Sequence, residues 1–157
     1  MDDDIEYMTF ALEQAKIAAR FDEVPVGSVI TDGSGNIIGH GYNRTISMCD
    51  PTAHAEIVAI RMAAASTGNY RLVGTTIYVT IEPCIMCMSA IIHARIARLV
   101  YGAPDLKWGG AGSLYDFTYD KRLNHTVEVV SGVCLNETRE IIRHFFKDKR
   151  SNKQCQI

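Results

Sequence analysis

The sequence lacks an apolar run of membrane-spanning length, an internal repeat and a low-complexity tract. Because a membrane-spanning helix needs about 20 consecutive apolar residues, we expect no membrane partner. The chain starts with three acidic residues after Met1, whereas a secretory signal peptide starts with basic ones. These absences predict a cytoplasmic protein.

Charge of one sign is also missing, because 16 basic residues nearly balance 18 acidic ones and leave a formal net charge of −2. A nucleic-acid partner would therefore have to meet a local basic patch. There are five cysteines, and two of them, Cys84 and Cys87, stand three positions apart. This odd count and this spacing favour a reduced compartment over a disulfide framework.

The remaining composition, with 47% hydrophobic and 22% charged residues in a chain of 157, is that of one globular domain. We assign residues 1–150 to this domain and residues 151–157 to a polar C-terminal tail. Hydrophobic spacing and β-branched runs predict helices at about 3–20, 50–67, 84–94 and 137–149, strands at about 24–31, 37–43, 75–80, 98–102 and 126–130, and a glycine-rich loop at 103–113.

The order of these elements predicts the fold class. Turn residues at 32–36 indicate an antiparallel hairpin, and strand–helix–strand units imply parallel neighbours. Asp50, Pro51 and Thr52 are expected to open the second helix, since Asp or Thr can cap it and Pro is tolerated in a first turn. The predicted fold is α/β, a three-layer α/β/α sandwich around a mixed sheet of roughly five strands.

Two short motifs indicate a metal centre. His54 and Glu56 lie in the first turn of the second expected helix, and Cys84 and Cys87 at the start of the third. Catalytic zinc uses three protein ligands from His and Cys and leaves the fourth position to water. The pattern predicts one Zn²⁺ per subunit on His54, Cys84 and Cys87, with Glu56 as the group that moves protons.

Bland alternatives exist for each motif. A lone C-x-x-C also occurs in redox pairs and in structural zinc sites, and Cys49 is the plausible fourth ligand for a structural site. The combination of H-x-E with a later P-C-x-x-C favours the catalytic interpretation, because it is the signature of zinc deaminases.

The sequence resembles the cytidine-deaminase-like superfamily and, within it, the bacterial tRNA-specific adenosine deaminases. The resemblance covers nearly the whole chain, through the segments 23–27, 41–44, 50–56, 78–87, 92–96, 110–114 and 123–125. It implies a homodimer that binds the anticodon stem-loop of a tRNA and hydrolyses the wobble adenosine to inosine. On this view, water activated at the zinc attacks C6 of an adenine flipped out of the loop.

The resemblance also implies substrate contacts at Asn43, Ala55, Asp105, Lys107 and Phe145. Asn43 matches a position that touches the flipped nucleoside, although an Asn there could instead end a strand and cap a turn. Asp105 and Lys107 match positions associated with the RNA backbone or sugar.

Trp108 departs from the small or polar residue that the family has at this position. It either stacks on an extruded anticodon base or packs as a lid on the core or on a dimer partner. Phe145 and Phe146 precede several basic residues, which suit an anticodon stem or merely the end of a helix. One of the two phenylalanines is expected in the core.

Two rival functions share these motifs. A deaminase of a free nucleobase or nucleoside, of the guanine or cytosine type, would use every catalytic residue named above. A non-catalytic, zinc-stabilised binding subunit would typically lack the glutamate, so the presence of Glu56 counts against it.

Overall fold

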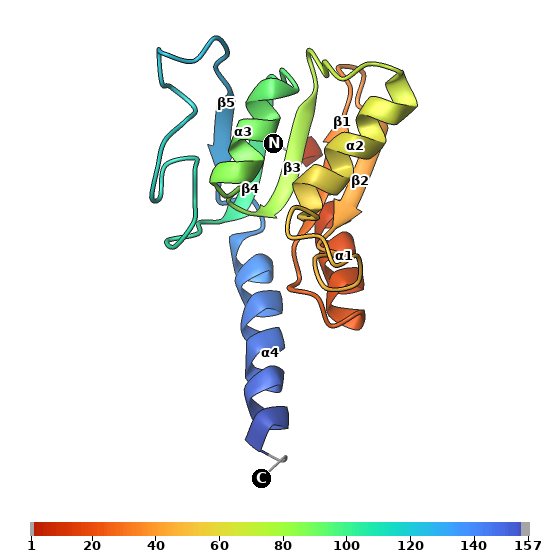
Figure 1. Cartoon of the computed structure of the whole chain (residues 1–157), viewed down its shortest axis with the longest axis vertical. Coiled ribbons are helices and arrows are strands. Elements are labelled where there is room, and N and C mark those ends of the chain that lie inside the picture. The colour runs from red at the N-terminus through yellow and green to blue at the C-terminus, as the bar shows by residue number, and fades with distance from the viewer. Residues whose placement is uncertain (1, 155–157) are drawn as a thin grey trace.

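The structure of the protein is a computed structural model that describes residues 2–154, with side chains described for residues 3–151 (Figure 1). Its elements follow the predicted order: α1 (Asp2–Arg20), β1 (Gly27–Thr31), β2 (Ile37–Tyr42), α2 (Ala55–Thr67), β3 (Thr76–Ile81), α3 (Ile85–His93), β4 (Arg98–Ala103), β5 (Glu128–Ser131) and α4 (Leu135–Gln154). The predicted α/β class and the mixed sheet of five strands are confirmed.

The sheet has the strand order β2-β1-β3-β4-β5. Strand β1 pairs antiparallel with both β2 and β3, whereas β3–β4 and β4–β5 are parallel pairs. The β1–β2 hairpin is therefore confirmed. The expectation of parallel neighbours is wrong for β2 and β3, because β1 lies between them, although these two strands do run in the same direction.

Helices cover both faces of the sheet, with α2 and α3 on one face and α1 on the other (Figure 1). Side chains alternate between two clusters along β3: Ile77 and Val79 join α3 residues such as Met88, and Tyr78 joins Met8 of α1. Alternation of this kind is what a strand buried on both faces requires.

Helix α2 begins later than the sequence suggested. Asp50 Oδ1 accepts hydrogen bonds from the Thr52 N–H, at 2.8 Å, and from its hydroxyl, at 2.7 Å, so this segment forms a separate turn. The helix starts at Ala55, whose N–H donates to Asn43 Oδ1 at 2.9 Å. The expected capping by Asp50 or Thr52 is therefore wrong, because a side chain from the end of β2 satisfies the first turn.

Helix α4 is longer than predicted and extends beyond the edge of the sheet (Figure 1). The expected polar tail is helical as far as Gln154, and its residues 155–157 lie outside the described part. Phe145 is half-buried and Phe146 is 43% exposed, so the expectation that one of them lies in the core is wrong. The reason is that the second half of α4 projects past the sheet.

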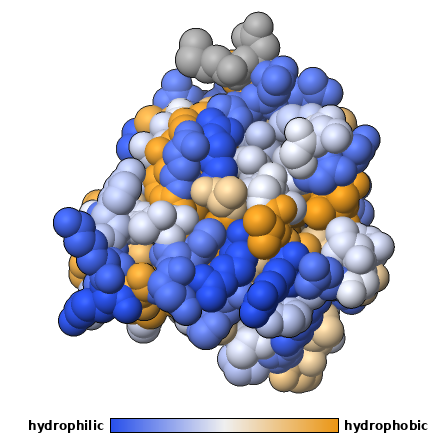
Figure 2. Space-filling model, turned by 90° about the horizontal axis from the view of Figure 1, so that it is seen from above, coloured by the Kyte–Doolittle hydropathy of each residue, from blue (hydrophilic) through white to orange (hydrophobic). Residues whose placement is uncertain are grey.

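Within the described residues, no helix combines the length and the apolar character needed to cross a membrane. Figure 2 shows the end of the molecule opposite the tip of α4, where hydrophilic side chains are interspersed with hydrophobic ones.

A partly buried ion pair joins α1 to the parallel half of the sheet. The Arg98 guanidinium donates to both carboxylate oxygens of Asp4, at 2.7 and 2.9 Å, and the Tyr78 hydroxyl donates to the same carboxylate at 3.2 Å. These hydrogen bonds, led by those from Arg98, lower the pKa of Asp4 despite its burial. Burial raises the pKa of Tyr78 to about 12.

We predict that Asp4→Asn destabilises the fold by about 2 kcal/mol at pH 7, since hydrogen bonds to a charged group are lost. A lowered folded-state pKa contributes stability above the unfolded pKa of about 3.9, and this contribution disappears as the pH falls through the folded value. The gap between Asp4→Asn and the unsubstituted chain should therefore narrow from pH 5 to pH 3 in urea unfolding.

The matched control is Asp3→Asn, which removes the same charge from an exposed neighbour and should leave stability within about 0.5 kcal/mol. A pH-independent gap for Asp4→Asn would contradict the electrostatic explanation.

Candidate active site

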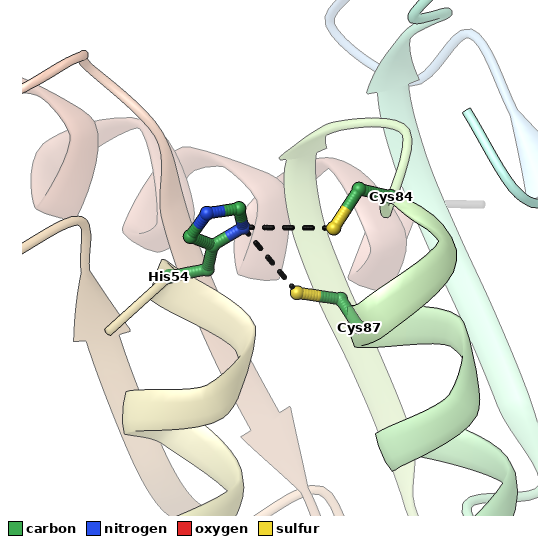
Figure 3. A group of neighbouring side chains, drawn as sticks. All are labelled: His54, Cys84 and Cys87. Atoms are coloured by element: carbon green, nitrogen blue, oxygen red, sulfur yellow. Dashed lines mark hydrogen bonds between the residues drawn. The ribbon is translucent and has the colours of Figure 1, made fainter. Parts of the chain in front are cut away.

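Three predicted metal-donor side chains meet between the starts of α2 and α3 (Figure 3). His54 Nδ1 lies 3.6 Å from Cys84 Sγ and 3.6 Å from Cys87 Sγ. The ligand atoms of all three residues lie within 4.8 Å of one another. His54 and Cys84 directly precede their helices in extended conformation, and Cys87 lies in the first turn of α3. One cation can therefore contact all three.

The donor set fits zinc, because one imidazole and two sulfurs are ligands that this ion prefers. Cys49, the candidate for a fourth ligand of a structural site, does not join the group. It is exposed, and its Sγ contacts the Ile46 carbonyl oxygen at 3.7 Å. Within residues 2–154 the cluster thus has three donors, which is the number that catalytic zinc uses.

The two thiols differ in their preference for negative charge. A hydrogen bond from Cys87 lowers the pKa of Cys84 to about 4, in spite of burial and with help from His54. The same hydrogen bond, together with burial, raises the pKa of Cys87. Charge therefore gathers on Cys84 at the amino end of a helix, where a cation completes the balance.

Glu56 is buried in the first turn of α2 and faces the same cavity as the donor group. Burial raises its pKa to about 7, and the nearby negative charge of Cys84 acts in the same direction. A carboxyl group with a pKa near neutrality can both accept and release a proton, which is the property a general acid–base needs.

The cavity has a volume of about 750 Å³. Asn43, Asp105 and Trp108 line it together with His54, Glu56 and Cys84. Pockets of this size accept a small organic ligand such as a nucleoside. The structure thus brings most of the expected site residues to one place.

The other three expected contacts lie elsewhere. Ala55 is fully buried, and its N–H is taken by Asn43 Oδ1. Lys107 is exposed on the loop beside the cavity. Phe145 lines a groove between α1 and α4, packs edge-on against Phe146 and lies under the Lys149 ammonium group.

Asn43 combines the two roles that the sequence left open. Its oxygen caps α2 through the Ala55 N–H, and its side chain also lines the cavity. Because the oxygen serves the helix, the amide NH₂ group is the part that can donate to a ligand.

Sequence reasoning missed two buried glutamates, each of which anchors a loop at the cavity. Glu23 accepts hydrogen bonds from the N–H groups of Ile46 and Ser47, at 3.0 and 2.7 Å. Burial opposes ionisation of Glu23, yet these bonds lower its pKa. Glu82 binds the loop after β4 in the same way. The available signal was an acid beside an apolar strand, just before P-C-x-x-C in the case of Glu82.

Known proteins share this chain's fold and sequence. The model of the cytidine and deoxycytidylate deaminase zinc-binding region matches residues 1–103. The tRNA-specific adenosine deaminase of Haemophilus influenzae is 48% identical over 98% of this chain and 88% of its own length. A solved structure from studies of A-to-I editing by tRNA A34 deaminases at the wobble position has a TM-score of 0.83 at 45% identity, over 87% of this chain and 98% of that one.

A guanine deaminase of Bacillus subtilis is more distant, with a TM-score of 0.63 at 33% identity over 78% of this chain and 81% of that one. The higher identity and the fuller overlap lie with the tRNA enzymes. This chain therefore belongs to the zinc-binding cytidine and deoxycytidylate deaminase family, in the branch of the tRNA-specific adenosine deaminases.

Proposed function

We propose that this protein hydrolyses the wobble adenosine of a tRNA anticodon to inosine and releases ammonia. One observation carries the proposal: a three-donor metal group and a buried glutamate with a pKa of about 7 open into one cavity of about 750 Å³. The relatives named tRNA-specific adenosine deaminase support the choice of substrate.

His54, Cys84 and Cys87 would hold a zinc ion, which when bound supplies a Lewis acid that acidifies water. Glu56 takes a proton from the attacking water and passes it to the ring nitrogen N1. It then transfers the second proton to the amino group on C6, so that ammonia leaves and inosine remains. The overall balance is adenosine plus water to inosine plus ammonia.

The cavity walls supply the contacts that orient the base. The Asn43 amide NH₂ can donate to an acceptor of the nucleoside, beside the buried backbone of Ala55. Asp105 and Lys107 suit the sugar and the backbone of the strand that leads into the cavity. Trp108, 64% exposed at the cavity wall, offers a face on which a second extruded base can stack.

Helix α4 extends the contact surface toward the stem. Phe145 and Lys149 lie together there, and a cation near an aromatic ring suits a phosphate backbone with adjacent sugars. We assign this surface to the anticodon stem.

We further propose a homodimer with one zinc per subunit, working in the cytoplasm, where tRNA resides. The half-exposed apolar side chains Ile85 and Met86 on α3 support a subunit contact, because apolar area of this kind is stabilised by burial. In the alternative function, deamination of a free nucleobase, the same catalytic residues would act on a small molecule.

An inosine assay tests the proposal directly. A tRNA transcript with a wobble adenosine should acquire inosine, whereas free guanine and cytosine should stay unchanged. Glu56→Ala should keep its zinc and its fold but lose at least about 1,000-fold in turnover, because only the proton transfer is removed.

Glu6→Ala, an exposed glutamate on α1, serves as the matched control and should turn over like the unsubstituted chain. Activity on guanine with none on tRNA would overturn the substrate, and near-normal turnover of Glu56→Ala would overturn the mechanism.

Metal analysis separates a three-ligand centre from a structural four-ligand site. His54→Ala should lose most of the bound zinc, since only the two thiolates remain. Cys49→Ala should keep the full content, because Cys49 lies outside the donor group. Loss of zinc from Cys49→Ala would contradict the open coordination position.

Binding of an anticodon stem-loop measures the role of Trp108. Trp108→Ala should weaken affinity about tenfold, within the range of about 1–3 kcal/mol for base–aromatic stacking. Tyr119→Ala removes an aromatic ring that is 67% exposed on the same long loop, and its affinity should match the unsubstituted chain. Equal affinities for the two variants would exclude stacking on Trp108.

A further inference from the structure

The loop between β4 and β5 forms one wall of the cavity, and part of it is wrapped around the carboxylate of Glu82. Oε2 accepts the Asp105 N–H at 3.0 Å, and Oε1 accepts the N–H groups of Ala111 and Ser113, both at 3.0 Å. The Ser113 hydroxyl also donates to Oε2. Glu82 is 2% exposed, so these bonds replace nearly all of its contact with water.

The backbone of this loop leaves no room between itself and the carboxylate. A Cβ on Gly109 would lie 2.5 Å from Glu82 Cδ and 2.5 Å from Oε2. Gly109 also forms an isolated bridge with Cys84, and the Gly110 N–H donates to the Pro83 carbonyl oxygen at 2.9 Å. The loop is thus fastened to the segment that carries a metal donor.

The same loop presents residues to the cavity mouth. Asp105 Oδ1 accepts the N–H of Lys107 at 2.9 Å and of Trp108 at 3.2 Å, so these residues form one turn. Glu82 holds that turn through the Asp105 N–H. A single buried carboxylate therefore determines where Asp105 and Trp108 stand at the cavity.

We propose that Glu82 is a positioning residue for nucleic-acid binding: it orders the segment 105–113 so that Asp105, Lys107 and Trp108 meet the nucleotide strand. It acts through hydrogen bonds to the loop and does not touch the reacting atoms. The identity of the strand rests on the proposed function, whereas the ordering of the loop is a property of the chain alone.

Trp108 is the single tryptophan of the chain, so its fluorescence reports on this loop without any substrate. Glu82→Gln places an NH₂ group opposite backbone N–H donors and loses at least one acceptor. We expect the amplitude of nanosecond depolarisation of Trp108 to rise about twofold in time-resolved anisotropy, as a loosened loop requires.

Kinetics on an anticodon stem-loop give the second measurement. For Glu82→Gln we expect KM to rise about tenfold and kcat to fall by less than about threefold, because binding is lost more than chemistry. The zinc content should equal that of the unsubstituted chain. A merely structural lesion would instead lower zinc content and kcat together.

Two further variants keep the test decisive. Ser113→Ala removes one donor to Glu82 and leaves the Pro83–Cys84 segment intact, so it should shift anisotropy and KM in the same direction by a smaller factor. It decides the question if Glu82→Gln fails to fold. Glu6→Gln removes a carboxylate from exposed α1 and should leave the Trp108 signal unchanged.

Trp108 anisotropy equal to that of the unsubstituted chain in both Glu82→Gln and Ser113→Ala would overturn the proposal, and so would a lowered kcat at constant KM. If the unsubstituted chain formed no inosine, the proposed function would fail, while the anisotropy would still decide whether Glu82 orders the loop.

Discussion

Strand β1 runs against the other four strands of the sheet, and this reversal brings the carboxyl ends of β2, β3 and β4 to the same edge. Asn43 follows β2, Glu82 and Cys84 follow β3, and Asp105 follows β4. Helices α2 and α3 both start from that edge on the same face, so their amino ends meet. The metal donors, the proton-transfer group and the loop beside them all depend on this arrangement, as in other open α/β sheets.

Three buried glutamates around the cavity show how surroundings assign different roles to one side-chain type. Glu56 has a pKa raised to about 7 by burial and by a nearby thiolate, which suits proton transfer. Glu23 is buried too, but N–H donors lower its pKa and keep it charged as a loop anchor. Glu82 likewise accepts several donors from a loop. Hydrogen-bond supply therefore separates acid–base chemistry from positioning.

Element types and their order were predictable because apolar spacing and turn residues act locally. The limits of several elements were not. Helix α2 begins at Ala55 rather than near Asp50, since its cap comes from Asn43, 12 positions earlier in the chain. Helix α4 continues to Gln154 although much of it projects past the sheet. Local residue preferences do not contain either contact.

The sequence alone determined the chemistry of the site: one imidazole, two thiols at helical spacing and a glutamate two positions after the histidine. Spacing of this kind is local, and ligand preference is a property of the side chains themselves. Only the tertiary structure decided that these groups share a cavity with Asn43, Asp105 and Trp108, and that Glu82 anchors the loop carrying the last two. Those relations depend on strand direction and long-range hydrogen bonds, which form only when distant segments pack together.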